Sequence, residues 1–404
     1  LTAWRFAIGR SGKEHTVHTN IVKNHSIKLI SCMSAYLISA ASLAQPYDAG
    51  EQGRFVIAGY GDVKYEESDL LDSSAFSARF VPIFLFSLND KMHVEAETEI
   101  SLNEAGETEV ELEYADIHYF LTDTTTVTAG KFLLPFGQFS ANFHPSWINR
   151  TPWTPGIYGS HGSAQAMTPL LPILSDVGIA VQQTFFFTSQ QKIFLDLYVT
   201  NGARAEAHND GDEIIEDHAE DEEVVDEHTE AFPEVEFAAT SGDNNKNKAF
   251  GGRIAYAFLP AIEIGASYYT AKYDEEERLS ITAQGMDINV IGSRYLIRGE
   301  YILTETDGLE EADEHAEETI NAFKRNGWYL QGVLQAGQIW PQLGGTELVV
   351  EYAKTNKFAK AKRWVAGLNY WLDPRSVIKF SYEETDIEEG DDDQRLAVQY
   401  SYGF

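Results

Sequence analysis

The stretch that decides the fold is the C-terminal decapeptide Arg395-Leu-Ala-Val-Gln-Tyr-Ser-Tyr-Gly-Phe404. Strand side chains point alternately to two faces, so one face is apolar or aromatic from Leu396 to Phe404, while the other carries Arg395, Gln399 and Ser401. In water this strand would expose a row of apolar side chains, whereas a closed barrel in lipid requires the alternation. An ordinary edge strand is the alternative for the decapeptide alone, and the rest of the chain decides between them.

The end of the chain resembles the closing strand of bacterial outer-membrane β-barrels, which carry a terminal Phe preceded by aromatic or apolar residues at alternate positions. The resemblance implies that Tyr400, Tyr402 and Phe404 form an assembly signal read by the barrel assembly machinery. It also implies the outer membrane of a Gram-negative bacterium as the location, with membrane lipids and lipopolysaccharide as partners.

The composition restricts the class of protein. The 404 residues would suffice for several soluble domains or for one large barrel. After the N-terminal region there is no run of about 18 apolar residues, which excludes a bundle of transmembrane helices. The formal net charge of -33 argues against nucleic acid as a partner, because binding a phosphate backbone requires a basic surface.

Residues 1–44 are predicted to be an upstream extension followed by a signal peptide. Lys23 and Lys28 precede the apolar run 29–43, and Ser42-Leu43-Ala44 offers small residues at the two positions that a signal peptidase reads. We expect cleavage after Ala44.

The remainder, residues 45–404, is predicted to be an all-β, 16-stranded antiparallel transmembrane β-barrel. In 92–102, for example, Met, Val, Ala, Thr, Ile and Leu alternate with His, Glu and Ser. Segments of this kind, repeated along a chain, are typical of an outer-membrane barrel. The predicted strands are 55–65, 76–88, 92–102, 110–121, 126–134, 177–188, 192–200, 250–258, 262–273, 280–290, 295–304, 328–335, 347–354, 363–372, 377–383 and 395–404.

The connections between these strands are predicted to alternate between short periplasmic turns and long external loops. With an even number of strands, both termini are expected in the periplasm. The lumen of such a barrel is wide enough to hold water, so passive diffusion is the expected function.

The long connection 138–175 is predicted to be a constriction loop. Its segment 143–156 combines aromatic residues with several prolines, and a stiff, partly apolar loop must bury itself somewhere. In general sixteen-stranded porins, which the predicted barrel resembles, the third external loop folds inward and narrows the channel. A loop at the surface or in a contact between subunits is the alternative.

Short motifs resemble the phosphate-selective porin O and P family. The resemblance extends over most of residues 45–404, although each motif is short, and it implies a homotrimer of sixteen-stranded barrels with diffusion and no catalysis. The matching pieces are Gly130-Lys131-Phe132, Pro135-Phe136-Gly137, Tyr198-Val-Thr-Asn-Gly202, Leu296-Ile-Arg-Gly-Glu-Tyr301, Gly327-Trp-Tyr-Leu-Gln331 and Gly367-Leu-Asn-Tyr370.

The charged residues expected in the lumen depart from that family. Its phosphate selectivity depends on lumenal lysines and arginines near the constriction, whereas 138–175 contains Arg150 and no lysine. Because a ring of one charge selects the opposite ion, we expect a cation preference. An anion- or phosphate-selective porin is one alternative, and a lumen whose acids are merely paired with arginines is another. The predicted pore-lining residues are Glu95, Glu97, Glu99, Glu111, Glu113, Lys131, Arg150, Arg253, Arg298, Glu300 and Arg363.

The connection 203–248 is predicted to be an acidic, His-containing external loop. It is dense in Asp and Glu and carries His208, His218 and His228. Carboxylates and imidazoles suit divalent ions, so the loop could bind divalent cations loosely, and no other cofactor is expected. A solvated acidic loop, which repels anions or bridges lipopolysaccharide through divalent ions, is the alternative.

No catalytic constellation is apparent. The chain has serines and histidines but no Gly-x-Ser-x-Gly motif and no nucleophile with a base at a defined spacing. We therefore expect no enzyme. A barrel that only anchors a metal-capturing surface protein is the competing function.

Overall fold

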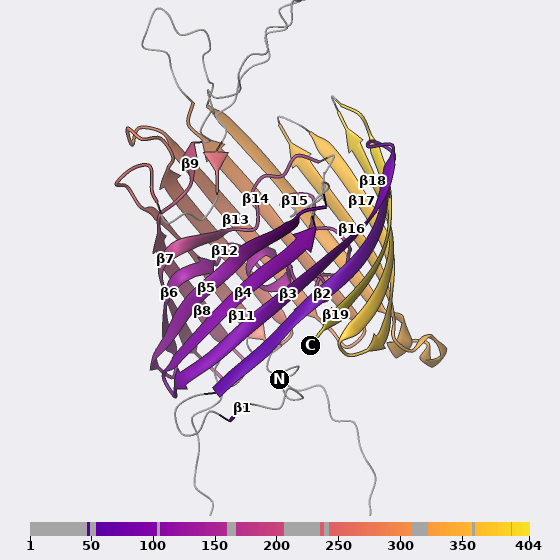
Figure 1. The fold of residues 1–404 in the computed structure, drawn as a ribbon, viewed down its shortest axis with the longest axis horizontal. Helices are drawn as coiled ribbons and strands as arrows, with labels where there is room; N and C mark the ends of the chain where they lie inside the picture. The colour runs from indigo at the N-terminus through magenta and orange to yellow at the C-terminus, as the bar shows by residue number, and fades with distance from the viewer. Residues whose placement is uncertain are drawn as a thin grey trace, which may run out of the picture.

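The computed structural model describes residues 47–48, 54–102, 106–159, 167–205, 235–237, 242–308, 322–357, 360–388 and 390–404. These residues form a closed antiparallel barrel of sixteen strands, β2 to β8 and β11 to β19 (Figure 1). Each strand pairs with the next along the chain, β8 pairs with β11, and β19 closes the barrel on β2. The predicted fold class is confirmed.

The bounds of the barrel strands are β2 Arg54–Ser68, β3 Ser73–Asn89, β4 Met92–Leu102, β5 Thr108–Thr122, β6 Thr125–Leu133, β7 Ser175–Phe186, β8 Lys192–Thr200, β11 Ala249–Leu259, β12 Ile262–Lys272, β13 Ser280–Ile291, β14 Tyr295–Thr306, β15 Phe323–Gln335, β16 Thr346–Asn356, β17 Ala361–Asp373, β18 Ser376–Ile387 and β19 Asp393–Gly403. Three short strands lie outside this set: β1 Tyr47–Asp48 pairs with β2, and β9 Arg204–Ala205 pairs with β10 Val235–Glu236. A π-helix, η1 Phe139–Phe143, and two 3-10 helices, η2 Ala336–Gln338 and η3 Pro341–Leu343, complete the described elements.

The predicted strand ranges agree closely with these bounds, and 92–102 and 192–200 coincide with β4 and β8. The largest difference is at β15, which begins at Phe323 rather than at 328. At the start of β15 the outward-facing residues are Lys324 and Asn326, which are polar. The outward row of apolar side chains that marked the other strands in the sequence is therefore missing there.

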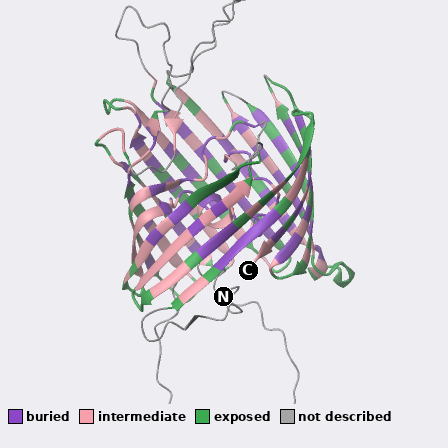
Figure 2. Cartoon of the chain, in the orientation of Figure 1, coloured by how far each residue is buried: buried purple, intermediate pink, exposed green. Residues whose placement is uncertain are grey.

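Along most strands, and most regularly from β11 to β19, more buried and more exposed side chains alternate, as the banding in Figure 2 shows. In β19, Leu396 and Tyr400 are 46% and 40% exposed, whereas Ala397 and Gln399 are 0% and 1% exposed. The apolar face therefore points outward and the polar face points into the barrel. No helix in the described part of the chain is both long enough and apolar enough to cross a membrane.

The barrel closes at the last residue of the chain. Gly59 and Phe404 exchange two backbone hydrogen bonds of 3.2 and 2.9 Å, and the Phe404 ring stacks on Phe80 at 5.3 Å between centroids. Gly59 has φ +155, and a Cβ there would lie 2.7 Å from the Phe404 ring. A glycine is required because the Val81 carbonyl oxygen, 2.3 Å from where a Cβ would lie, and the terminal ring occupy that space.

The two ends of the barrel differ. β2 begins and β19 ends at one end, which we call the turn end, and connections 134–174 and 201–248 leave from the other, the loop end (Figure 1). Not every connection at the loop end is long, because 69–72 and 357–360 are as short as turns. Residues 1–46, including the predicted signal peptide, lie outside the described residues.

Replacing the terminal ring tests this closure. We expect Phe404→Ser to lower the yield of folded barrel, because the variant loses the ring pair with Phe80, which contributes about 1 kcal/mol beyond its buried area. Heat-modifiable mobility on electrophoresis measures the folded fraction. Leu396→Ser removes an outward apolar side chain from the same strand and is the control; equal loss in both variants would contradict a special role for Phe404.

Candidate pore interior

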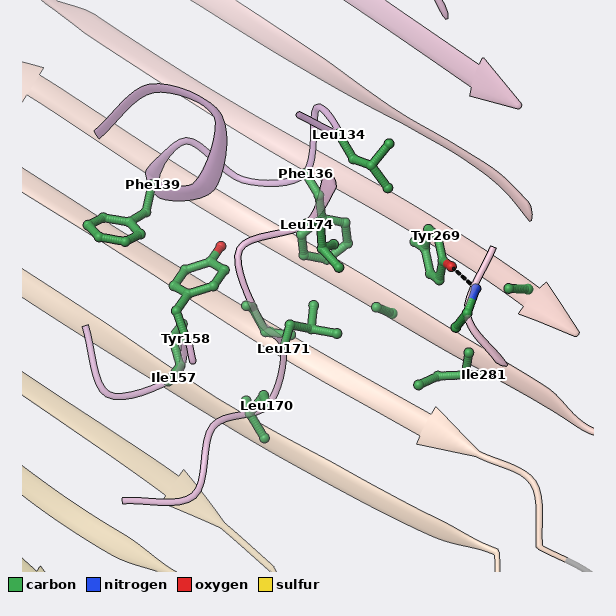
Figure 3. Packing of buried hydrophobic residues seen from close by; sticks show 14 of the residues in the cluster. Leu134, Phe136, Phe139, Ile157, Tyr158, Leu170, Leu171, Leu174, Tyr269 and Ile281 are labelled. Carbon is green, nitrogen blue, oxygen red and sulfur yellow. Dashed lines mark hydrogen bonds between the residues drawn. The ribbon is translucent and has the colours of Figure 1, made fainter. Parts of the chain in front are cut away.

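Between β6 and β7, the described residues 134–159 and 167–174 leave the barrel wall and run along the inside of the barrel (Figure 3). We call these residues the inner loop. Leu134 N–H donates to Leu174 C=O at 2.9 Å, which joins the two ends of the loop. Its apolar side chains lie in one cluster with inward-facing side chains of β8 and β11 to β17, among them Tyr269 and Ile281. The aromatic and proline-rich sequence thus finds its buried environment in the lumen.

The first bend of the inner loop is held by the carboxylate of Glu300 on β14. Glu300 is 5% exposed and accepts hydrogen bonds from Phe139 N–H at 2.6 Å and Gln138 N–H at 3.2 Å. The hydroxyls of Tyr158 and Tyr329 donate to it at 2.6 and 3.1 Å. Four donors therefore surround one buried carboxylate, which is the arrangement a buried acid needs.

Two local features allow this arrangement. Gly137 has φ +63, and a Cβ at this position would lie 2.0 Å from Glu300 Oε2, so only glycine lets the backbone approach the carboxylate. Burial raises the pKa of the Tyr158 phenol, and the charge of Glu300 raises it further. Tyr158 therefore stays protonated and donates.

The middle of the inner loop crosses to the opposite wall. Trp147 packs against Tyr60, Val81 and Ile83 of β2 and β3. Trp153 packs against Val365 and Ala397 of β17 and β19. The loop is therefore fixed by apolar contacts on both sides of the lumen.

Polar side chains of the same wall bind the carbonyl groups of the inner loop. Lys379 Nζ donates to Ser146 C=O and, at 2.9 Å, to Gln399 Oε1. Arg363 Nη2 donates to Thr154 C=O at 2.8 Å, and Asn369 Nδ2 donates to Arg150 C=O at 3.0 Å. These groups position the loop. Lys379 and Arg363 are each 1% exposed and so contribute little surface to the open lumen.

Most inward-facing arginines are also paired with carboxylates of neighbouring strands. The following distances join a guanidinium nitrogen to a carboxylate oxygen. Arg363 lies 3.0 Å from Glu383 and 3.5 Å from Glu351, and Arg395 contacts Glu383 and lies 3.2 Å from Glu66. Arg253 lies 2.6 Å from Asp287 and 2.9 Å from Glu263, and Arg79 lies 3.0 Å from Asp62 and 3.1 Å from Glu99. The interior wall is thus a network of ion pairs. This is the arrangement expected under the alternative prediction that the lumenal acids are paired with arginines.

The acidic residues predicted on β4 and β5 lie on the inward face. Glu97 accepts a hydrogen bond from Tyr60 at 2.9 Å, and Glu99 pairs with Arg79. Glu111 is directly opposite Glu99 in the strand register and therefore shares its face. Glu113 stands at an irregularity of the register and is buried, at 4% exposed.

The inward-facing charged side chains differ in accessibility. The side chain of Glu95 on β4 is 24% exposed and that of Glu263 on β12 is 22% exposed, and Glu111 is classed with the exposed residues. On β17 and β19, the side chains of Arg363 and Arg395 are 1% and 2% exposed. The side chains of Glu351 and Glu383 are covered as fully as that of Arg363, and Arg79, at 26%, is about as accessible as Glu95.

The other predicted basic residues have separate environments. Arg150 of the inner loop lies 3.4 Å from Glu347 and 5.0 Å from the Trp371 ring. The Arg298 guanidinium of β14 stacks on Phe143 of the inner loop at 3.7 Å. Both arginines thus join the loop to the wall.

The position of Lys131 corrects its prediction as a pore-lining residue. Lys131 is in register with Ala115 and Val177, whereas its neighbour Phe132 is 4% exposed and packs inside the barrel. Lys131 therefore lies on the outward face and donates to Leu112 C=O. The charge of Lys131 suggested that it faces the water-filled lumen, but the strand register determines which face a side chain is on.

The predicted metal-binding residues His208, His218 and His228 lie outside the described residues. Within the described ranges, no group of three or more His, Cys, Asp or Glu side chains is placed to hold a metal ion.

Several interior residues were not singled out from the sequence. Four of them occupy inward positions that could have been predicted from the period-two alternation of their strands: Asp62, Arg79, Asp287 and Glu383. The partnership of Tyr158 with Glu300 could not be found in this way, because it depends on the path of the inner loop.

Comparison with known proteins gives a structural likeness. No protein-family model matches the chain, and no curated protein sequence matches it. An anion-selective porin from Comamonas acidovorans is similar at TM-score 0.56 and 11% identity, covering 87% of this chain and 100% of that one. The outer membrane channel DcaP of Acinetobacter baumannii gives TM-score 0.53 and 10% identity, covering 88% and 99%. Salmonella typhi OmpF, in complex with daunomycin, gives TM-score 0.52 and 12% identity, covering 87% of this chain and 98% of that one.

The chain has the fold of bacterial outer-membrane porins. At these identities the likeness concerns the barrel fold alone, and no family model supports the specific resemblance to the phosphate-selective porins O and P.

Substitution of Glu300 tests how the inner loop is held. In Glu300→Ala four buried donors lose their acceptor, at about 1–3 kcal/mol for each group left unpaired, so the Gln138 and Phe139 amides should exchange with solvent much faster. Hydrogen–deuterium exchange measures this. Glu305→Ala, on the outward face of the same strand, is the control; unchanged exchange in Glu300→Ala would contradict the role of this carboxylate.

Proposed function

We propose that the protein is an outer-membrane porin that forms a water-filled channel for passive diffusion of ions and small hydrophilic solutes. The observation that carries the proposal is the inner loop, which is fixed to a polar, charged interior wall of a closed barrel. We propose that this loop forms the constriction predicted for 138–175. The similar structures support it, since they include an anion-selective porin and an outer membrane channel. A passive channel needs no catalytic group, so no enzymatic activity is proposed.

Within this function we propose a preference for cations. The inner loop uses Lys379 and Arg363 as donors to its own carbonyl groups, while Glu95 and Glu111 remain accessible on the opposite wall. Arg79 is more accessible, at 26%, but two carboxylates neutralise it. Accessible charge of one sign favours the opposite ion. Anion or phosphate selectivity is the alternative, since one similar structure is an anion-selective porin.

Reversal potentials in a KCl gradient across a planar bilayer test the selectivity. The wild type should favour K⁺ over Cl⁻, and Glu95→Gln/Glu111→Gln should lower the permeability ratio severalfold, because each carboxylate attracts a nearby cation by about 1 kcal/mol in water. Glu384→Gln, on the outward face of β18, should leave the ratio unchanged. A wild type that favours Cl⁻ would reject the cation preference, and a barrel without conductance steps would reject the channel and leave a surface anchor as the alternative.

We also propose that the protein is a homotrimer in the outer membrane with both termini in the periplasm, after removal of a signal peptide ending at Ala44. One similar structure, OmpT of Vibrio cholerae, is described as a trimer form, with TM-score 0.50 and 9% identity. Lys131 supports a protein contact on the outward face of β6, because an ammonium facing hydrocarbon costs about 3 kcal/mol, and the side chains beside it, Ala115 and Val177, are small.

Charge reversal at Lys131 tests this contact. Lys131→Glu should lower the fraction of trimer in native mass spectra of the detergent-solubilised protein, because a partner that accommodates an ammonium repels a carboxylate. Lys91→Glu, in the turn between β3 and β4, should behave as the wild type. A monomeric wild type, or a variant with an unchanged trimer fraction, would contradict the proposal.

For the acidic loop 203–248 we keep loose binding of divalent cations at His208, His218 and His228 as a proposal secondary to the channel. It rests on composition alone.

A further inference from the structure

Two lysines lie directly opposite each other on the outward face of the barrel near the loop end. Lys354 of β16 is the register partner of Lys362 of β17. Both point outward, because their strand neighbours Ala353, Ala361 and Arg363 are buried inside. Like charges directly opposite on a strand pair destabilise it, so an anion bound between the two ammonium groups would stabilise this pair.

The protein supplies little compensation. Lys362 Nζ lies 3.6 Å from Asp386 Oδ2, but these side chains are 55% and 61% exposed, and an exposed pair at this separation contributes little. Lys354 makes no hydrogen bond or ion pair with the described residues. By contrast, two neighbouring exposed lysines have close partners: Lys324 lies 2.8 Å from Glu305 and Lys360 lies 3.0 Å from Glu388.

Three aromatic rings lie beside this lysine pair. Trp328 is the register partner of Lys354 on the other side. The Tyr352 ring lies 5.2 Å from that of Trp328 and 4.5 Å from that of Trp364, which follows Lys362 by two positions on the same face. Tryptophan and tyrosine gather at the level of lipid headgroups, so the ammonium groups stand where lipid phosphates lie.

Apolar side chains continue the outward face below the rings. Leu330, Leu348, Val350 and Leu368 are between 41% and 52% exposed. They form a surface along which acyl chains can extend, directly beneath the two ammonium groups. A free phosphate ion would not use this surface.

We propose that Lys354 and Lys362, with the rings of Trp328, Tyr352 and Trp364, bind the phosphate group of a phosphorylated glycolipid in the leaflet at the loop end. The phosphate neutralises both ammonium groups and the acyl chains cover the apolar residues below. The inference rests on the proposed outer-membrane location and does not depend on conduction through the channel, since the site is on the outside of the barrel.

Native mass spectrometry with diphosphorylated lipid A as the probe tests the site on the detergent-solubilised protein. Lys354→Gln/Lys362→Gln should weaken binding by about tenfold or more, because each basic group at a charged membrane surface contributes substantially to lipid attraction. Lys324→Gln, whose lysine stands on the neighbouring strand with a carboxylate partner, is the matched control and should bind as the wild type. Heat-modifiable mobility verifies that the variants fold.

Two further probes separate a lipid site from a simple phosphate site. Dephosphorylated lipid A should bind more weakly than lipid A, and inorganic phosphate should not displace lipid A at comparable concentration. Equal binding of the dephosphorylated lipid, displacement by inorganic phosphate, or equal loss in Lys324→Gln would each overturn the proposal. Conductance of the double variant should equal that of the wild type, so failure at this site is distinguishable from failure of the channel.

A stability measurement gives an independent readout. Without lipid, removing one of the two opposed charges in Lys354→Gln should raise the melting temperature in detergent, because the like-charge pair is lost. Addition of lipid A should raise the melting temperature of the wild type by more than that of the variant. A variant that melts below the wild type without lipid would contradict the repulsion on which the site is based.

Discussion

Every backbone N–H and C=O group of a strand in hydrocarbon must find a partner within the protein, and the whole structure depends on this requirement. The sixteen-strand ladder meets it only because β19 returns to β2. At that seam the terminal Phe404 bonds to Gly59 through the backbone and its ring lies over the missing side chain. Closure gives each strand one side on the outside of the barrel, which is largely apolar, and one side in the lumen, which is largely polar.

The interior depends on a second pairing requirement. A loop that enters the lumen brings backbone carbonyl and N–H groups into a confined space, where they need partners. Glu300 accepts from the N–H groups at the first bend, and Lys379, Arg363 and Asn369 donate to carbonyl groups farther along. Lys379 and Arg363 are thereby used for positioning the loop and contribute little surface to the open lumen.

Period-two alternation was sufficient to predict the strands and the inward positions of Glu97 and Arg363, because a barrel in lipid enforces that period over every strand. It failed at Lys131, where charge was given more weight than register; Val127, Ala129 and Leu133 on the same face already indicated that Lys131 points outward. The contacts of Tyr158 and Trp147 could not be predicted, because the path of a long loop is decided by tertiary packing and leaves no periodic signal.

The inner loop has a mechanical consequence. It is attached at Glu300 on β14 and, across the lumen, at Lys379 on β18 and around Trp147 beside β2 and β3. A wide barrel without such attachments could flatten into an ellipse when the lateral pressure of the membrane changes. A loop attached to separate parts of the barrel wall resists that deformation. The lumen should therefore keep its diameter when the surrounding lipid becomes thinner, stiffer or more tightly packed.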